Sequence, residues 1–159
     1  MLDWLENTGV ARMVQESMWA YPIVLSSHAV GMAIVVGIVL MINFRILGLA
    51  SGVPLSALKT MYRFALLGLV INGVSGTMLF VANADAFFES NPFRIKIILL
   101  IIGITLMVML SRRLFGSTDS VQNVVPTKQV KIMASISIVV WTGVIVAGRL
   151  IAYLDWKIF

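Results

Sequence analysis

Four long apolar segments constrain this chain more than any other feature of its sequence. They cover approximately residues 18–42, 61–82, 95–115 and 132–154. A helix needs about 20 apolar residues to cross roughly 30 Å of hydrocarbon, and each segment meets that length. The chain has 159 residues, of which 60% are hydrophobic and only 12% are charged. A soluble domain of this size cannot bury so much apolar surface, so we expect four transmembrane helices in lipid.

The breaks between these segments carry the signals of turns and helix starts. Gly52 and Pro54 precede the second segment, and Asn91 and Pro92 occupy the expected N-cap and first helical position of the third. Residues 116–127 form the longest expected loop. Short connections join antiparallel neighbours. The sequence therefore predicts an all-α, integral membrane, up-down-up-down four-helix bundle in a single domain covering residues 1–159. The mixed apolar and acidic start, MLDWLENTG, predicts a short interfacial helix before it.

Basic residues predict the orientation of the bundle, because Lys and Arg are enriched in cytoplasmic loops. One side of the predicted bundle holds seven of them, Arg45, Lys59, Arg63, Arg112, Arg113, Lys128 and Lys131. The other side holds five, Arg12, Arg94, Lys96, Arg149 and Lys157. We therefore expect both termini to face away from the cytoplasm. Since the basic residues flank apolar segments, they indicate membrane topology and not nucleic-acid binding.

Polar residues near the centre of each predicted span are the second notable feature. His28, the only histidine, lies two residues from the midpoint of the first span, which is about 3 Å along a helix. Asn72, Thr105 and Thr142 lie near the centres of the other three. Lipid offers these groups no hydrogen-bond partner, so we expect a polar layer inside the bundle. Small residues repeat every fourth position at Ser27–Gly31 and Gly68–Asn72–Gly76, which favours close helix packing. A seven-residue polar repeat, Lys128, Ser135, Thr142 and Arg149, is expected in the bundle interior or at an oligomer interface.

Two interpretations of His28 remain open at this point. In the first, Asn72 or a threonine accepts its N–H, and the histidine is part of helix packing worth about 0.6 kcal/mol. In the second, His28 is a metal ligand that binds the iron of haem b. Arg149 and Lys96, about 10 and 13 Å outward of the span centres, would then reach the haem propionates. Both cations could instead extend to the lipid headgroups. The candidate cofactor-binding residues are thus His28, Arg149, Lys96 and Asn72.

Three stretches, WAYPIVLSSHAVGMAIVVG, NFRILGL and VSGTMLFVANADAFFESNPFRIK, carry a resemblance to a known group of proteins. They resemble an uncharacterised bacterial inner-membrane family of small four-helix proteins. The resemblance rests on Tyr21, Pro22, His28, Gly31, Arg45, Gly48, Asn91, Pro92, Phe93 and Lys96. It implies the bacterial inner membrane and no settled function. In that membrane, the termini expected to face away from the cytoplasm would lie in the periplasm. The chain is also loosely similar to b-type cytochrome and copper-resistance membrane bundles. Those bundles use paired histidines, so the single histidine excludes a bis-histidine haem within one chain.

Three functions are compatible with these features. The first is an electron-transfer subunit that binds haem b, or a quinone, at His28. The second is a non-catalytic accessory or assembly subunit of a membrane complex. The third is an oligomeric transporter or ion pathway, although no acidic residue lies within a predicted span. The expected partners are the lipid bilayer, further copies of the chain or a larger complex, and quinone. No catalytic triad, metal-hydrolase motif or nucleotide-binding loop is present, so we do not expect an enzyme.

Overall fold

The computed structural model describes residues 2–115 and 126–154, with the backbone alone at positions 55, 56 and 154. Within these ranges the chain is helical nearly throughout and contains no strand, which confirms the all-α prediction. The helices are α1 (Asp3–Glu6), α2 (Gly9–Glu16), α3 (Ala20–Leu47), α4 (Leu55–Ala82), α5 (Ala84–Glu89), α6 (Asn91–Phe115) and α7 (Lys128–Leu154).

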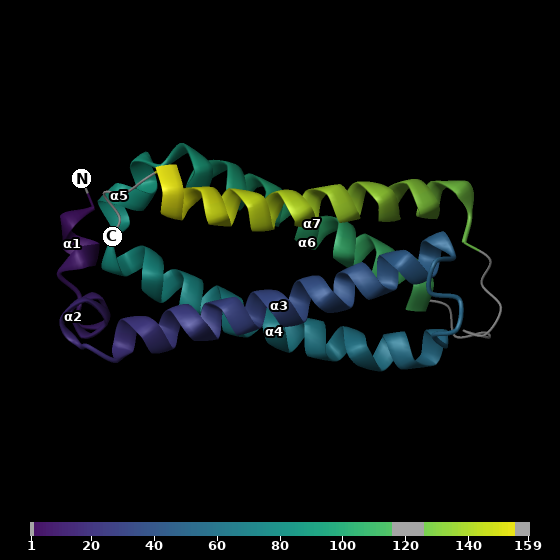
Figure 1. The fold of residues 1–159 in the computed structure, drawn as a ribbon, viewed down its shortest axis with the longest axis horizontal. Helices are drawn as coiled ribbons and strands as arrows, with labels where there is room; N and C mark the ends of the chain where they lie inside the picture. The colour runs from purple at the N-terminus through teal and green to yellow at the C-terminus, as the bar shows by residue number, and fades with distance from the viewer. Residues whose placement is uncertain (1, 116–125, 155–159) are drawn as a thin grey trace.

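Four of the helices, α3, α4, α6 and α7, are long and apolar enough to cross a membrane. Each runs antiparallel to the one before it, and the short helices α1, α2 and α5 gather at one end of the bundle (Figure 1). Helix α3 packs along α4, α6 packs along α7, and α3 also contacts α7. The predicted up-down-up-down bundle is therefore confirmed, and the protein is a multi-pass membrane protein.

The helices extend beyond the predicted spans, most clearly at the end of α3 and the start of α4. Helix α3 continues to Leu47 and ends at Gly48, whose φ of +90° lies in the left-handed region that glycine adopts without strain. Helix α4 starts directly after Pro54. Apolar length marks only the part of a helix inside hydrocarbon, whereas backbone hydrogen bonding continues into the interfacial layer. For this reason the apolar segments predicted too early an end for α3 and too late a start for α4.

Packing inside the bundle is apolar, and so is most of its outer surface. Val35, Val39, Met107 and Trp141 are each at most 3% exposed and form part of one buried cluster between the two helix pairs. Val139, at 71% exposed, is typical of the outward-facing aliphatic side chains. A soluble protein would not expose so many of them, but lipid solvates them without cost.

The start of the chain differs from the single interfacial helix that the sequence predicted. Two helices, α1 and α2, are separated at Asn7 and Thr8, and the Thr8 hydroxyl accepts a hydrogen bond from the Ala11 N–H at 3.3 Å. Helix α2 buries Ala11 and Val14, and the Gln15 side chain donates to the Ala82 carbonyl at 2.5 Å. Helix α2 packs on α3 and α4, so this segment is attached to one end of the bundle (Figure 1).

A second difference concerns the start of α6. Ser90, and not Asn91, lies before the first helical residue, and its hydroxyl accepts a hydrogen bond from the Phe93 N–H at 3.2 Å. Serine and asparagine are about equally good N-caps, so the sequence alone did not distinguish them. Most of the predicted loop at 116–127, namely residues 116–125, lies outside the described residues.

Helices α1 and α5 are joined by hydrogen bonds that should make the N-terminal segment sensitive to pH. The Leu2 N–H donates to Asp85 at 2.8 Å, and the Asp85 N–H donates to Glu6 at 3.1 Å. The first of these bonds lowers the pKa of Asp85 below its ordinary value. A carboxyl with a lowered folded-state pKa stabilises the folded segment above its ordinary pKa of about 4 and loses that contribution as the pH falls further.

We therefore predict that α1 detaches from α5 as the pH falls below about 4. The chain has no cysteine, so Trp4→Cys, at a position 67% exposed, accepts a single spin label. Between pH 6 and pH 3, its electron paramagnetic resonance spectrum should show a mobile fraction that grows only as the pH falls below about 4. With Asp85→Asn the label should be mobile across the same range. Equal mobility in both proteins at every pH would contradict the prediction.

Candidate functional site

A close contact between the backbones of α3 and α4 positions the candidate site. A Cβ atom added to Gly31 would lie 2.8 Å from the Asn72 nitrogen and 2.9 Å from the Gly68 oxygen. A Cβ atom added to Gly68 would lie 3.1 Å from the Gly31 oxygen. Only glycine permits this approach, as expected from the small-residue spacing. The approach places His28, which lies one turn before Gly31, directly against α4.

The imidazole of His28 is held on its Nδ1 side by α4. Nδ1 lies 3.1 Å from the Asn72 carbonyl oxygen and 3.2 Å from the Ser75 hydroxyl. In return, the Asn72 side-chain amide donates to the His28 carbonyl at 2.9 Å. The Ser75 hydroxyl donates its own hydrogen to the Ile71 carbonyl at 2.7 Å. Both groups facing Nδ1 are therefore acceptors, which assigns the proton to Nδ1 and leaves Nε2 as an acceptor.

Lys96 of α6 completes the site on the opposite side of the ring. Its Nζ lies 3.4 Å from Nε2 of His28 and can donate to it. The lysine stem crosses α7 at Gly148, where an added Cβ would lie 3.5 Å from the lysine Cε. Among the described residues, no carboxylate forms an ion pair with this ammonium. The site thus combines residues of α3, α4 and α6, beside α7.

The depth of this pair along its apolar helices makes it unusual. His28 lies about 8 Å from the midpoint of α3, and Lys96 lies about 10 Å from the midpoint of α6. Both distances are shorter than the roughly 15 Å by which hydrocarbon extends on either side of a bilayer centre. An ammonium group among apolar helices is costly, and such groups tend to mark a functional site.

The site residues predicted from the sequence are only partly brought together. His28, Asn72 and Lys96 meet, whereas Arg149 lies exposed on α7, with its guanidinium 5.6 Å from the centre of the Tyr153 ring. Among the described residues, Arg149 forms no hydrogen bond with His28, Asn72 or Lys96.

The prediction of a polar layer from all four helices was wrong. Thr105 and Thr142 are exposed on the outside of the bundle, and the Thr105 hydroxyl donates to the Ile101 carbonyl of its own helix at 2.8 Å. A hydroxyl bonded within its own helix in this way needs no partner across the bundle. The repeat Lys128, Ser135, Thr142 and Arg149 is exposed throughout, so it does not line the bundle interior.

Sequence reasoning also missed a second polar contact. Asn43 of α3 donates through its side-chain amide to the Ser137 hydroxyl of α7 at 3.0 Å, and both residues are 0% exposed. The sequence did contain a signal for this contact, because Asn43 is an asparagine within an apolar run, as Asn72 is. The passage of Lys96 over Gly148 had no comparable signal, because it depends on how α6 and α7 are aligned.

The tautomer of His28 can be tested directly, since it is the only histidine. We predict that the nitrogen NMR spectrum of ¹⁵N-histidine-labelled protein shows a protonated Nδ1 and an unprotonated Nε2. Ser75→Ala should leave this tautomer unchanged, because the Asn72 carbonyl still accepts. Lys96→Met should shift the Nε2 signal by removing its donor. A proton on Nε2 in the unsubstituted protein would contradict the assignment.

Fold and site together define a small multi-pass membrane protein, with four long helices and a lysine–histidine pair within the spans. The chain belongs to DUF6644, a family of unknown function, which it matches over residues 3–154. No curated protein and no solved structure matches the chain.

Proposed function

We propose that this protein is an electron-transfer subunit of the bacterial inner membrane that binds a quinone head group at His28 and Lys96. The observation that carries the proposal is the 3.4 Å contact between Lys96 Nζ and His28 Nε2. It places a cationic hydrogen-bond donor beside an imidazole that can exchange protons, within the apolar part of the bundle. A quinone is itself apolar apart from its carbonyl oxygens, which accept hydrogen bonds.

The chemistry of quinol oxidation fits the two side chains. Conversion of quinol to quinone releases two electrons and two protons. The unprotonated Nε2 of His28 would accept the proton of the quinol hydroxyl beside it, while Nδ1 remains anchored to the Asn72 carbonyl. The Lys96 ammonium would bond to the same oxygen and stabilise the negative charge that develops there as the proton leaves. The other hydroxyl would lose its proton to water, and the electrons would pass to a redox partner in a larger membrane complex.

Haem b is the second candidate, favoured by the anchoring of Nδ1. Histidines that bind a metal usually donate their other ring N–H to a carbonyl or carboxylate, as His28 does to Asn72. His28 would supply one axial ligand, and the haem would supply one-electron chemistry. Lys96 lies on the side of Nε2, so binding of iron there requires its ammonium to move away. This requirement makes quinone the better fit to the arrangement.

One preparation distinguishes these candidates. The full chain is purified in mild detergent from cells supplied with haem, its visible spectrum is recorded before and after reduction, and its bound quinone is extracted and quantified. The proposal predicts about one quinone per chain or per oligomer and no haem bands. Haem bands that disappear in His28→Ala would favour the second candidate. If the preparation contains neither quinone nor haem, both candidates are wrong. An accessory subunit or an oligomeric pathway would then remain.

The excess of basic residues on one side supports an orientation with both ends of the described chain in the periplasm. Helix α1 and the end of α7 lie at the same end of the bundle, which such an orientation requires (Figure 1). A membrane-impermeant maleimide should label Trp4→Cys in intact cells whose outer membrane is permeabilised. Labelling only after the cells are lysed would show that residue 4 lies on the cytoplasmic side, which is the opposite orientation.

A further inference from the structure

The buried pair Asn43–Ser137 leaves one strong hydrogen-bonding atom without a partner. Asn43 donates to Ser137, but its side-chain oxygen, Oδ1, has no partner among the described residues. Both side chains are completely buried. An unpaired amide oxygen inside a protein costs about 1–3 kcal/mol, so nearly all such atoms are bonded to protein or to ordered water.

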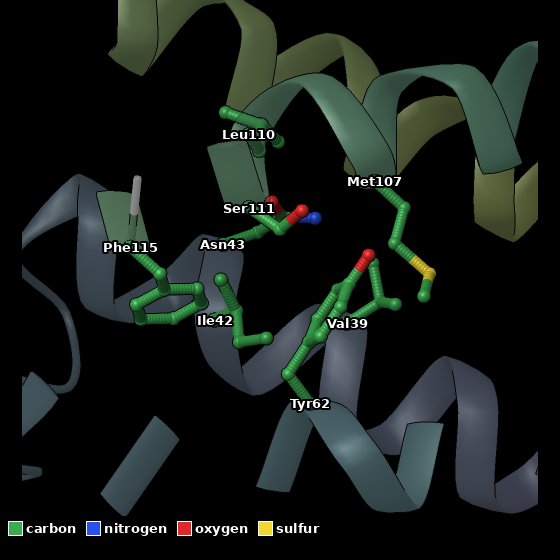
Figure 2. A pocket seen from close by; sticks show the side chains of 8 residues that line it. All are labelled: Val39, Ile42, Asn43, Tyr62, Met107, Leu110, Ser111 and Phe115. Carbon is green, nitrogen blue, oxygen red and sulfur yellow. The ribbon is translucent and has the colours of Figure 1, made fainter. Parts of the chain in front are cut away.

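A small cavity lies beside Asn43. Its volume is about 10 Å³, and its polar lining consists of Asn43 from α3, Tyr62 from α4 and Ser111 from α6. Figure 2 shows these three side chains around one space, which is otherwise lined by apolar side chains that include Ile42, Met107 and Leu110. One water molecule requires about 10–15 Å³ of this kind of space and two to four polar partners.

We propose that this cavity is a binding site for a single water molecule. The water donates one hydrogen to Asn43 Oδ1 and the other to the Ser111 hydroxyl, and it accepts the hydroxyl hydrogen of Tyr62. The Ser111 oxygen is free to accept, because its hydrogen is donated to the Val108 carbonyl at 2.9 Å. A metal cation does not fit, since all three polar groups are neutral and no described carboxylate lines the cavity.

The bound water connects all four membrane helices at one level. The direct Asn43–Ser137 bond joins only α3 to α7. Through the water, the same asparagine also reaches α4 at Tyr62 and α6 at Ser111. This site is separate from the proposed quinone site, because Asn43 lies fifteen residues, or about 22 Å, along α3 from His28. A result at one site therefore does not decide the other.

The test is water-edited solid-state NMR of the full chain in lipid bilayers, with ¹⁵N-labelled asparagine and ¹³C-labelled valine. Asn43→Leu assigns the Asn43 side-chain signal. Magnetisation should pass from water to the Asn43 amide at least about fivefold faster than to buried Val35, and more slowly than to exposed Asn91. Transfer no faster than to Val35 would overturn the proposal. Transfer as fast as to Asn91 would also overturn it, since it would indicate an open aqueous channel.

Ser111→Val gives a second measurement. The added methyl group occupies the cavity and removes one partner of the water. Transfer to Asn43 should fall to the level of Val35, while Thr105→Val, on the outer face of the same helix, should leave it unchanged. Fast transfer that persists in Ser111→Val would overturn the site. If Ser111→Val does not fold, the transfer rate to Asn43 in the unsubstituted protein, compared with the rates to Val35 and Asn91, still tests the proposal.

Discussion

Gly31→Ala should cause a loss of stability far larger than its single added methyl group suggests. The new Cβ would lie 2.8 Å from the Asn72 nitrogen and 2.9 Å from the Gly68 oxygen. Both are backbone atoms, which cannot rotate aside as a side chain can, so α3 and α4 must separate. Overpacking of this kind costs about 1–3 kcal/mol, and we expect a decrease of that size in the free energy of unfolding measured by titration with a denaturing detergent.

Gly37→Ala is the matched control for this substitution. Gly37 lies six residues further along the same helix, and a Cβ added there meets no atom within 4 Å. Alanine has the higher helix propensity, so Gly37→Ala should leave stability unchanged or raise it by up to about 1 kcal/mol. Equal effects at the two glycines would mean that the close contact of α3 with α4 does not determine stability. Gly31→Ala should also disturb the His28–Asn72 hydrogen bonds, because both helices carry them.

The same contact shows how much of the fold could be predicted from the sequence. Membrane helices are constrained by one simple requirement, that every backbone polar group inside lipid be bonded within the helix. Apolar length therefore predicted the four spans and their antiparallel order. The small residues at 27, 31, 68 and 76 indicated a close approach, and Gly31 and Gly68 lie within it. Helix ends were less predictable, because Ser90 and Asn91 cap equally well.

The site was harder to predict, because depth along a helix does not determine which way a side chain faces. Asn72 and Thr105 both lie near the centres of their spans, yet only Asn72 reaches His28. An asparagine amide has two donor hydrogens and an acceptor oxygen, so a single bond to its own helix leaves part of it unsatisfied in lipid, whereas a threonine hydroxyl can donate its one hydrogen to the carbonyl four residues earlier. This difference explains why the asparagines at 43 and 72 are buried while Thr105, bonded to Ile101 of its own helix, faces outward. Amides in membrane spans are thus better indicators of interior contacts than hydroxyls.

Lys96→Met should separate function from stability more clearly than any other substitution. Methionine keeps an unbranched stem to lie against Gly148 but removes the ammonium beside His28. A hydrogen bond to a charged group is worth about 1.5–3 kcal/mol, so quinone affinity should fall by roughly 10- to 150-fold. Titration of a short-chain quinone into the protein in lipid nanodiscs, followed by quenching of tryptophan fluorescence, measures this loss. The unfolding free energy should stay the same or rise, because an unpaired charge has been removed from an apolar environment.

Two further variants test whether the loss of quinone binding is specific to the Lys96 ammonium. Lys59→Met removes an exposed lysine from the start of α4, at the opposite end of the bundle, and should leave quinone binding unchanged. Lys96→Arg keeps the positive charge, but its larger planar group does not match the position of a compact ammonium, so binding should be only partly restored. If Lys96→Met binds quinone with unchanged affinity, its ammonium takes no part in binding and the proposed quinone site is wrong. If affinity and stability fall together, Lys96 instead holds the helices in place, since a lysine that serves only the ligand cannot be needed for folding.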